Sequence, residues 1–372
     1  MHVPFCATRC GYCDFNTYTP AELGQANGSA RTTYVEAAID EVRMARRLLG
    51  DRAPTVQTIF FGGGTPTLLH TAHLSAVIAA ISAEFGLADD AEITTEANPD
   101  SVASWDLEEM RGAGLNRISF GMQSAVDRVL ATLQRTHDPL RIPAVVEWAR
   151  TAGFDQISLD LIYGTPGETL TDWRLSLEAA LACRPDHISA YALIVEKGTA
   201  LFRQVQSGEL AAPDDDDQAE KYLLADERFA VDGLEWYELS NWSRSVASQS
   251  RHNLLYWTGG DWWGVGAGAH SHIGGVRWWN LRHPTAYAAR IADDTSPAEA
   301  REVVSPQSRR MERVMLELRL RAGLPVAALD SGGLQAVPDL LDRGLIITSG
   351  GRLVLTRQGR LLADAVVRDL LP

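Results

Sequence analysis

Three cysteines near the start of the chain have the spacing of a metal-binding loop. Cys6, Cys10 and Cys13 form a C-x3-C-x2-C pattern, and the fourth cysteine, Cys183, lies far away in the sequence. Thiolates this close together can bind one iron–sulfur cluster, and Gly11 allows the tight turning that such a loop needs. Because a [4Fe–4S] cluster has four irons, three cysteines would leave one iron open to another ligand.

A structural zinc site and three free thiols are the alternatives to a cluster. A structural zinc ion takes four Cys or His ligands, and no fourth Cys or His follows the three cysteines at a regular spacing. Disulfides between these neighbours would close only very small loops, so clustered thiols more often bind a metal. The spacing therefore favours a cluster, and we expect Cys183 to be a buried structural thiol.

The residues around the cysteines resemble the signature of the radical S-adenosylmethionine (SAM) superfamily. The segment HVPFCATRCGYCDF is similar to the branch of proteins related to oxygen-independent coproporphyrinogen III oxidase. The resemblance implies that Cys6, Cys10 and Cys13 hold a [4Fe–4S] cluster whose open iron is chelated by SAM. That branch usually has a Tyr just before this segment, whereas Met1 directly precedes His2 here. We therefore expect a clipped first strand, with the start of the family's pattern upstream of Met1.

Further motifs of the same branch follow in order along the chain: FGGGTPT from Phe61, EANP from Glu96, RISFGMQS from Arg117, LQRTH from Leu133 and SLDLIYGTPG from Ser158. Taken alone, the glycines would more often form a simple turn and Glu96 a cap or a surface carboxylate. The resemblance implies that Gly63 and Thr65 face the ammonium of SAM and that Arg135 pairs with its carboxylate. The SAM site that it implies comprises Phe15, Gly63, Gly64, Thr65, Glu96, Gln123, Arg135 and Asp160.

Two positions distinguish the two activities within this branch. The decarboxylating enzymes (HemN) carry an extra Cys two residues after the third ligand, where this chain has Phe15. The haem chaperones (HemW) carry an H-N-x-x-Y-W motif, which is matched here by His252, Asn253, Tyr256 and Trp257. Imidazole is a common haem ligand, and aromatic side chains can pack on a porphyrin. The alternative is that these aromatics fill a core and that His252 satisfies a buried hydrogen bond.

The resemblance therefore implies a haem chaperone that carries a [4Fe–4S] cluster and SAM and transfers haem to apo-haemoproteins. The alternative function is oxygen-independent coproporphyrinogen III oxidation, a radical decarboxylation of a porphyrin precursor. Whether the chain is an enzyme stays open, as do a homodimer and a peripheral contact with membranes. His270 and His272 are further candidates for a haem ligand. The nearby G-x-G-x-G pattern lacks the strand–turn–helix context of a dinucleotide site.

The first half of the chain alternates short apolar runs with amphipathic stretches. Strands are expected at Val56–Phe61, Glu92–Thr95, Arg117–Phe120, Gln156–Ile162 and His187–Leu193. Helices are expected at Thr33–Leu49, Leu74–Phe85, Ser101–Gly112, Ile142–Gly153 and Leu170–Ala182. With a first strand at the N-terminus, this repetition predicts a parallel α/β sheet or barrel of about six units, and the resemblance implies a partial (β/α) barrel. Active-site residues of such barrels lie at the carboxyl ends of the strands.

The pattern changes in the second half. The acidic run Asp214–Asp217 is expected to begin a helix over Gln218–Ala230, where negative charge suits the helix dipole. Trp236–Trp279 shows no clear helix, Ser305–Gly323 is expected to be helical, and a hairpin and a final helix follow. We expect a barrel core over residues 1–200, an extension with the HNLLYW segment over 201–296 and a winged-helix-like domain over 297–372.

Composition excludes several classes of protein. Hydrophobic residues make up 45% of the 372 residues, which is ordinary for a globular chain. The formal net charge of −14 argues against non-specific binding of nucleic acid, which selects for basic surfaces. No apolar run reaches the ~18 residues of a membrane span, and no signal peptide is visible. We therefore expect a cytoplasmic protein without a transmembrane segment.

Overall fold

The computed structural model describes residues 1–24 and 28–371, and its centre is one eight-stranded sheet. The first six strands of this sheet run parallel in chain order, and the last two add antiparallel at one edge. Within the described residues, β1 and β7 each pair on one side only, so the barrel is partial. The strands are β1 (His2–Val3), β2 (Val56–Gly63), β3 (Leu87–Ala97), β4 (Arg117–Gln123), β5 (Gln156–Tyr163), β6 (His187–Ala192), β7 (Glu235–Glu238) and β8 (Asn241–Ser243).

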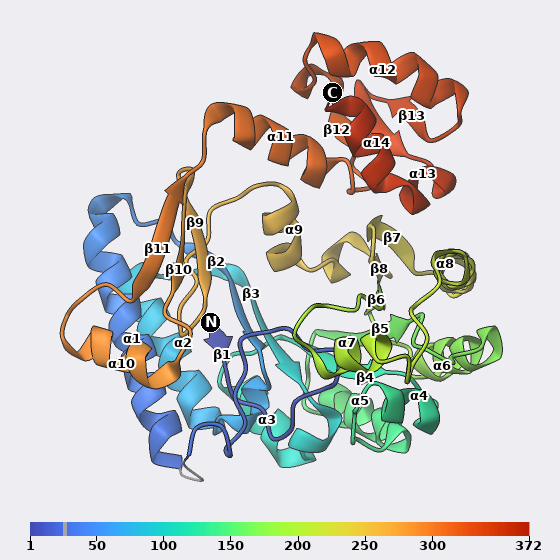
Figure 1. The fold of residues 1–372 in the computed structure, drawn as a ribbon. Coiled ribbons are helices and arrows are strands. Elements are labelled where there is room, and N and C mark those ends of the chain that lie inside the picture. Colours follow the sequence, from blue (N-terminus) through green and yellow to red (C-terminus); the bar gives the residue numbers. More distant parts are fainter. Residues whose placement is uncertain (25–27, 372) are drawn as a thin grey trace.

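Helices connect the parallel strands and cover the outside of the sheet (Figure 1). This arrangement confirms the predicted α/β fold of about six strand–helix units. The helix over Leu170–Ala182 has the predicted bounds, and the others differ from the prediction at one or both ends. The helices are α1 (Gly28–Leu49), α2 (Thr71–Phe85), α3 (Ser104–Gly112), α4 (Asp127–Thr132), α5 (Ile142–Thr151), α6 (Leu170–Ala182), α7 (Ala200–Gln206) and α8 (Asp215–Val231).

Alternation along the strands separates the core from the barrel interior. In β4, Ile118 and Phe120 are fully buried among the apolar side chains of the main core. Their neighbours Arg117, Ser119 and Gln123 line a pocket instead. Successive side chains of a strand point to opposite faces, so the apolar half packs on the helices and the polar half faces the interior. The barrel interior is consequently polar.

The segment from Trp236 to Trp279 differs from the prediction of no clear helix. It contains α9 (Arg251–Trp257), and it leads into a second, antiparallel sheet of β9 (His270–Ile273), β10 (Val276–Asn280) and β11 (Ala298–Val303). Helix α10 (Pro284–Ala292) packs on α1. Figure 1 shows this sheet beside α1 and α10, with α9 between it and the C-terminal part of the chain. The Gly-rich segment before β9 packs against the barrel, since Gly266 N donates to Glu41 Oε2 of α1 at 2.8 Å.

The C-terminal part has its own core, in which the helices α11 to α14 pack with a small three-stranded sheet. Helix α11 (Pro306–Glu317) is shorter than the predicted Ser305–Gly323, and the predicted final helix is divided into α13 (Arg357–Leu361) and α14 (Ala363–Leu370). The hairpin is confirmed. The remaining elements are β12 (Leu324–Pro325), α12 (Ser331–Asp342), β13 (Ile346–Ser349) and β14 (Arg352–Leu355).

Two smaller expectations have clear outcomes. Asp214 is the N-cap of α8 and accepts a hydrogen bond from Asp217 N, so the acidic run begins this helix as predicted. Cys183 ends α6 half-buried rather than buried, and its thiol donates to Ala179 O at 3.4 Å.

Across residues 1–24 and 28–371, no helix has the length and apolar character that a membrane crossing requires.

Candidate functional site

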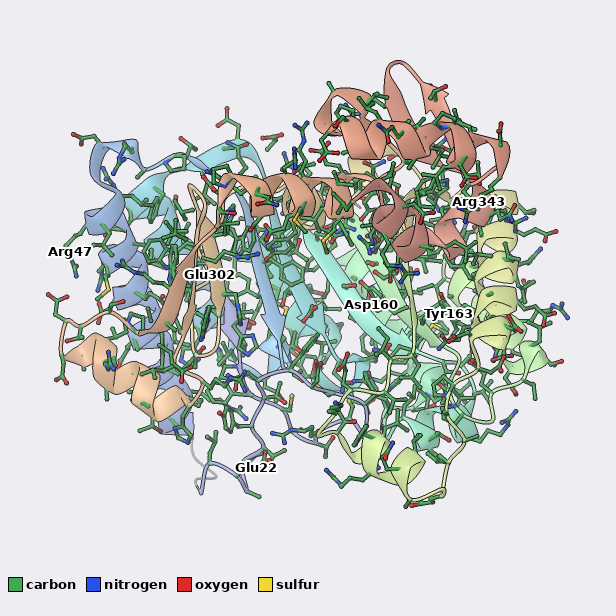
Figure 2. All side chains as sticks on the ribbon, turned by 45° about the horizontal axis from the view of Figure 1, so that its top comes forward. Glu22, Arg47, Asp160, Tyr163, Glu302 and Arg343 are labelled. Atoms are coloured by element: carbon green, nitrogen blue, oxygen red, sulfur yellow. The ribbon has the colours of Figure 1, made fainter. Side chains whose placement is uncertain are left out.

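One large pocket occupies the interior of the partial barrel. Its volume is about 740 Å³, and its walls come from the cysteine loop, from β2 to β6 and from α9. The predicted site residues that line it are Cys6, Cys10, Cys13, Phe15, Gly63, Gly64, Thr65, Glu96, Gln123, Arg135, Asp160, His252, Asn253 and Tyr256. Figure 2 shows Asp160 on the central strands, inside the molecule. The structure thus brings together every predicted cluster and SAM residue.

The cysteine loop is held at the pocket mouth by backbone contacts. Cys6 N donates to Tyr18 O at 3.1 Å, and Gly11 N donates to Leu133 O at 3.0 Å. A Cβ added at Gly11 would lie 2.9 Å from the side chain of Gln134, so a larger residue here would displace the flexible end of that side chain. All three thiols are free and half-buried. Burial raises the pKa of Cys6 to about 11 in the absence of a metal.

The glycine segment after β2 forms the wall beside Cys6. Gly64 N donates to Val3 O and Thr65 N to Phe5 O, both at 2.8 Å, which extends the pairing of the two-residue strand β1. A Cβ at Gly64 would lie 3.0 Å from Cys6 Sγ and 2.6 Å from Phe5 O. Only glycine lets this backbone approach the cysteine loop so closely.

This donor set fits a cluster better than a single metal ion. Over the described ranges 1–24 and 28–371, no three Cys, His, Asp or Glu side chains converge on a point that would hold one ion. A mononuclear zinc site would need such convergence, whereas the thiolates of a [4Fe–4S] cluster bind different irons. Arg135 Nη1 lies 3.5 Å from Cys10 Sγ and supplies a positive charge beside the loop. Free thiols, a cationic neighbour and an open pocket are what an anionic cluster would require.

Glu96 ends β3 and faces the glycine segment. Its Oε2 accepts a hydrogen bond from Gly63 N at 3.1 Å. Burial, with Asp160 as a second cause, raises the pKa of the Glu96 carboxyl to about 7. Asp160 accepts from Ser119 Oγ at 2.9 Å, and burial raises its pKa too. Two carboxyl groups in one buried pocket attract a cationic ligand.

Arg135 and Gln123 meet at Gly121. Arg135 Nη2 donates to Gly121 O at 2.8 Å, and its Nε is buried without an acceptor. A Cβ at Gly121 would lie 2.9 Å from Gln123 Nε2 and 3.2 Å from Arg135 Nη2. Gln123 has a φ of 61°, a left-handed backbone that non-glycine residues rarely adopt. Such strain is typical of functional sites.

His252 of α9 points into the same pocket. Its Nδ1 lies 2.8 Å from Thr58 Oγ1, and its Nε2 lies 2.8 Å from the Tyr256 hydroxyl. The ring stacks on Phe60 of β2 at 5.0 Å between centroids. Burial lowers the pKa of His252 to about 3, so the imidazole is neutral. A neutral imidazole oriented by a hydroxyl at one nitrogen is a suitable ligand for iron.

Among the other motif residues of the HNLLYW segment, Asn253 and Tyr256 line the pocket, and Trp257 does not. Tyr256 lines the pocket and packs edge-on against Trp262 at 4.7 Å. Trp257 Nε1 donates to Asn253 Oδ1 at 3.1 Å, and Trp257 itself is not among the pocket residues. The other two candidate haem ligands do not line the pocket: His272 packs against Trp262, and His270 stacks on Trp279. His252, Asn253 and Tyr256 are therefore the members of the motif that face a ligand.

Sequence reasoning missed several residues that build the site. Glu92 of β3 accepts hydrogen bonds from Arg251 N at 2.9 Å and His252 N at 3.0 Å, and so caps α9. Arg117 is 3% exposed and lines the pocket, although it belongs to a motif in which only Gln123 had been assigned a ligand contact. The alternation of polar and apolar residues in RISFGMQ was the signal that could have placed Arg117 inside the barrel.

Comparisons with protein families agree with this geometry. Residues 1–180 match the family model described as "Radical SAM superfamily", and residues 304–362 match the "HemN C-terminal domain". The described structure is similar to a solved structure entitled "Coproporphyrinogen III oxidase (HemN) from Escherichia coli is a Radical SAM enzyme", with a TM-score of 0.83. That match covers 99% of this chain and 88% of the other at 21% sequence identity, which shows a shared fold.

Curated relatives resemble the chain along its whole length. A protein named "Heme chaperone HemW" from Mycobacterium tuberculosis is 50% identical over 371 residues, which span 100% of this chain and 94% of the relative. The protein of the same name from Bacillus subtilis is 34% identical and covers 98% of this chain and 97% of its own length.

Proposed function

We propose, from the premise that this chain belongs to the HemW family of the radical SAM superfamily, that it is a haem chaperone. It binds haem and carries a [4Fe–4S] cluster and SAM. The observation that carries the proposal is the position of His252, whose neutral imidazole faces the same pocket as the three cysteines. The pocket therefore offers an iron ligand in addition to the cluster loop.

The cluster and SAM have separate parts of the pocket wall. Cys6, Cys10 and Cys13 would hold the cluster, which supplies redox chemistry when bound. Gly63 and Thr65 would receive the ammonium of SAM, and Arg135 its carboxylate, because a guanidinium reads a carboxylate with paired hydrogen bonds. The further SAM contacts would be Phe15, Gly64, Glu96, Gln123 and Asp160. Glu96 and Asp160 would balance the positive sulfonium.

Haem would bind at α9 through His252. In the hydrogen-bonded arrangement, Thr58 holds Nδ1 and Tyr256 holds Nε2, so an iron at Nε2 would displace only the Tyr256 hydroxyl. Tyr256 is 38% exposed and lies at the pocket wall. Asn253 and Trp257 would fix the position of the helix, and the aromatic neighbours would pack on the porphyrin.

Coproporphyrinogen III oxidation is the second candidate function, and Phe15 argues against it. The side chain of Phe15 is 60% exposed at the pocket wall, at the position where the decarboxylating branch has its extra Cys. The fold shared with the Escherichia coli oxidase shows that the barrel alone does not separate the two functions.

An anaerobic comparison of the two ligands tests the proposal. The reconstituted protein with SAM would be given coproporphyrinogen III in one sample and haem in another. We expect a stable Soret band with haem, and no protoporphyrinogen from coproporphyrinogen III. Conversion of coproporphyrinogen III together with failure to retain haem would contradict the chaperone function and establish the alternative.

The haem acceptors, the cellular compartment, the assembly state and the domain division belong to the same proposal. Apo-haemoproteins would accept the haem, and transfer would take place in the cytoplasm. A homodimer and a peripheral membrane contact are compatible with that role. The division into a core over residues 1–200, an extension over 201–296 and a C-terminal domain over 297–372 would place the haem segment between two rigid parts. Removal of residues 297–372 would test whether the core folds alone.

A further inference from the structure

Arg117 is a buried cation without a carboxylate partner. It is 3% exposed, and its Nη1 donates to Ser248 O at 2.9 Å. In the chain as described, this is the one hydrogen bond found for its guanidinium, and no ion pair includes it. By contrast, the buried cations Lys221 and Arg360 pair with Glu168 and Asp226. Buried charges are normally paired, so an unpaired arginine on a pocket wall indicates a ligand.

Three carboxyl groups, on β3, β5 and β7, are engaged in other contacts. Asp160 accepts from Ser119 Oγ with both of its oxygens. Glu92 caps α9, and Glu238 accepts from Asn241 and from Ser240 N. Arg117 influences Asp160, whose pKa it lowers slightly against the effect of burial, but no ion pair joins them. Among the described residues, Arg117 therefore has no ion-pair partner of its own.

The other groups beside Arg117 are neutral. His187 shares hydrogen bonds with Ser158 at 2.8 Å and with Tyr237 at 2.9 Å. Burial, and then the charge of Arg117, lower the pKa of His187 well below its usual range. Arg117 thus supplies positive charge to this part of the pocket.

Asn253 adds a second donor without an acceptor. Its Oδ1 accepts from Trp257 Nε1, which orients the amide, and its Nδ2 is buried with no hydrogen-bond partner. Asn253 lines the pocket and directly follows His252. Arg117 contacts Ser248, four residues before His252, so the cation, the free amide and the imidazole surround one end of α9. A buried guanidinium without an ion pair and a buried amide donor without an acceptor, both on one pocket wall, suit a carboxylate.

We propose that Arg117 and Asn253 bind a propionate of the porphyrin cargo, a step that rests on the proposed haem function. Haem carries two propionates at one edge of its ring, and an anchor for one of them would fix how the ring enters the pocket. SAM also has a carboxylate, but Arg135 beside Cys10 is placed to take it. Arg117 and Asn253 would then recognise the free carboxylates of the cargo, whereas His252 would bind its iron.

A comparison of the affinities for haem and for its dimethyl ester tests this inference separately from haem binding itself. Both have iron for His252, and only free haem has ionised propionates. We expect the wild type to bind haem about 10- to 100-fold more tightly than the ester, the ratio that a charge-assisted hydrogen bond gives. Equal affinities would overturn the inference while leaving haem binding intact. Failure to bind either compound would overturn both proposals.

Variants of Arg117 show whether this residue causes the preference for haem over its dimethyl ester. Arg117→Met should lose the preference for haem over the ester, whereas Arg117→Lys should keep part of it. Cluster content, measured as iron and sulfide, reports correct folding of both variants. A preference retained in Arg117→Met would overturn the assignment. If Arg117→Met instead lowers SAM affinity and leaves the preference for haem over its ester unchanged, Arg117 binds the carboxylate of SAM. That result would also overturn the assignment. If Arg117→Met fails to fold, the wild-type comparison decides.

Discussion

The three loop cysteines and Cys183 are chemically alike but lie in different surroundings. Cys6, Cys10 and Cys13 line the pocket beside a cationic Arg135, whereas the thiol of Cys183 donates to a helix carbonyl at the end of α6. A residue type alone therefore does not predict a ligand. The short spacing of the first three cysteines does, because it forces the thiols into one loop.

Serine substitutions should separate the two kinds of cysteine. Replacing Cys6, Cys10 or Cys13 by Ser removes a thiolate from the cluster site, so we expect loss of most of the iron and sulfide after anaerobic reconstitution. Cys183→Ser is the matched control and should keep the full content. A cluster lost from Cys183→Ser and retained in Cys13→Ser would refute the ligand assignment.

Arg135 should contribute to SAM affinity through its charge. Arg135→Ala removes the guanidinium expected to bind the SAM carboxylate, which should weaken binding by ~1.5–3 kcal/mol. Isothermal titration calorimetry under anaerobic conditions measures this. Arg174→Ala, an exposed arginine of α6, is the control. Unchanged affinity in Arg135→Ala would remove this residue from the site.

SAM affinity should also depend on pH through Glu96. Burial and Asp160 raise the pKa of Glu96 to about 7, so the carboxyl is protonated below pH 7 and ionised above it. A cationic ligand prefers the ionised form, so affinity should rise with pH up to about pH 7 and level off above it, at up to about tenfold per pH unit. Glu96→Gln should flatten this profile. A wild-type affinity independent of pH between 6 and 8 would contradict the assigned role.

At the scale of elements, the parallel strands and their helices could be predicted, and α9 could not. Strands such as Arg117–Phe120 and Gln156–Ile162 are marked by apolar residues at alternate positions, because the outer face of the sheet packs on the helices. Helix α9 is only seven residues long and too short to be stable alone. Its backbone is capped by Glu92, about 160 residues earlier in the chain, and such a contact leaves no local pattern. The polar strand β11 was missed for a similar reason, since its partner β10 determines it.

The cap on α9 should control haem binding more than SAM binding. Glu92→Ala removes the acceptor for Arg251 N and His252 N, which should lower the free energy of unfolding by about 1.5–3 kcal/mol and displace His252. We expect reduced haem affinity with SAM affinity within about twofold of the wild type, a difference of under ~0.5 kcal/mol. Asp89→Ala, an exposed carboxylate of the same strand, is the control. Equal losses of both ligands would show that Glu92 supports the barrel as a whole.

At the scale of the whole molecule, the C-terminal part is tied to the barrel by a buried ion pair. Arg360 donates to both oxygens of Asp226 of α8, at 2.8 and 2.7 Å, and its guanidinium lies 4.5 Å from the ring centre of Trp236. Helix α11 packs on α9, so the same C-terminal part also supports the haem segment. The order of helices, hairpin and final helix predicted a winged-helix-like domain here, but the residues that join this part to the barrel became visible only in the structure.

The central claim is that haem binds through His252 in the pocket that holds the cysteine loop. A haem titration followed by Soret absorbance tests it, with cluster-reconstituted wild type, His252→Ala and His283→Ala as a control for surface histidines. We predict that His252→Ala loses or shifts the Soret band while its iron and sulfide content stays at the wild-type level, and that His283→Ala behaves like the wild type. Wild-type affinity and spectrum in His252→Ala would show that this imidazole only fills the barrel, and would contradict the account.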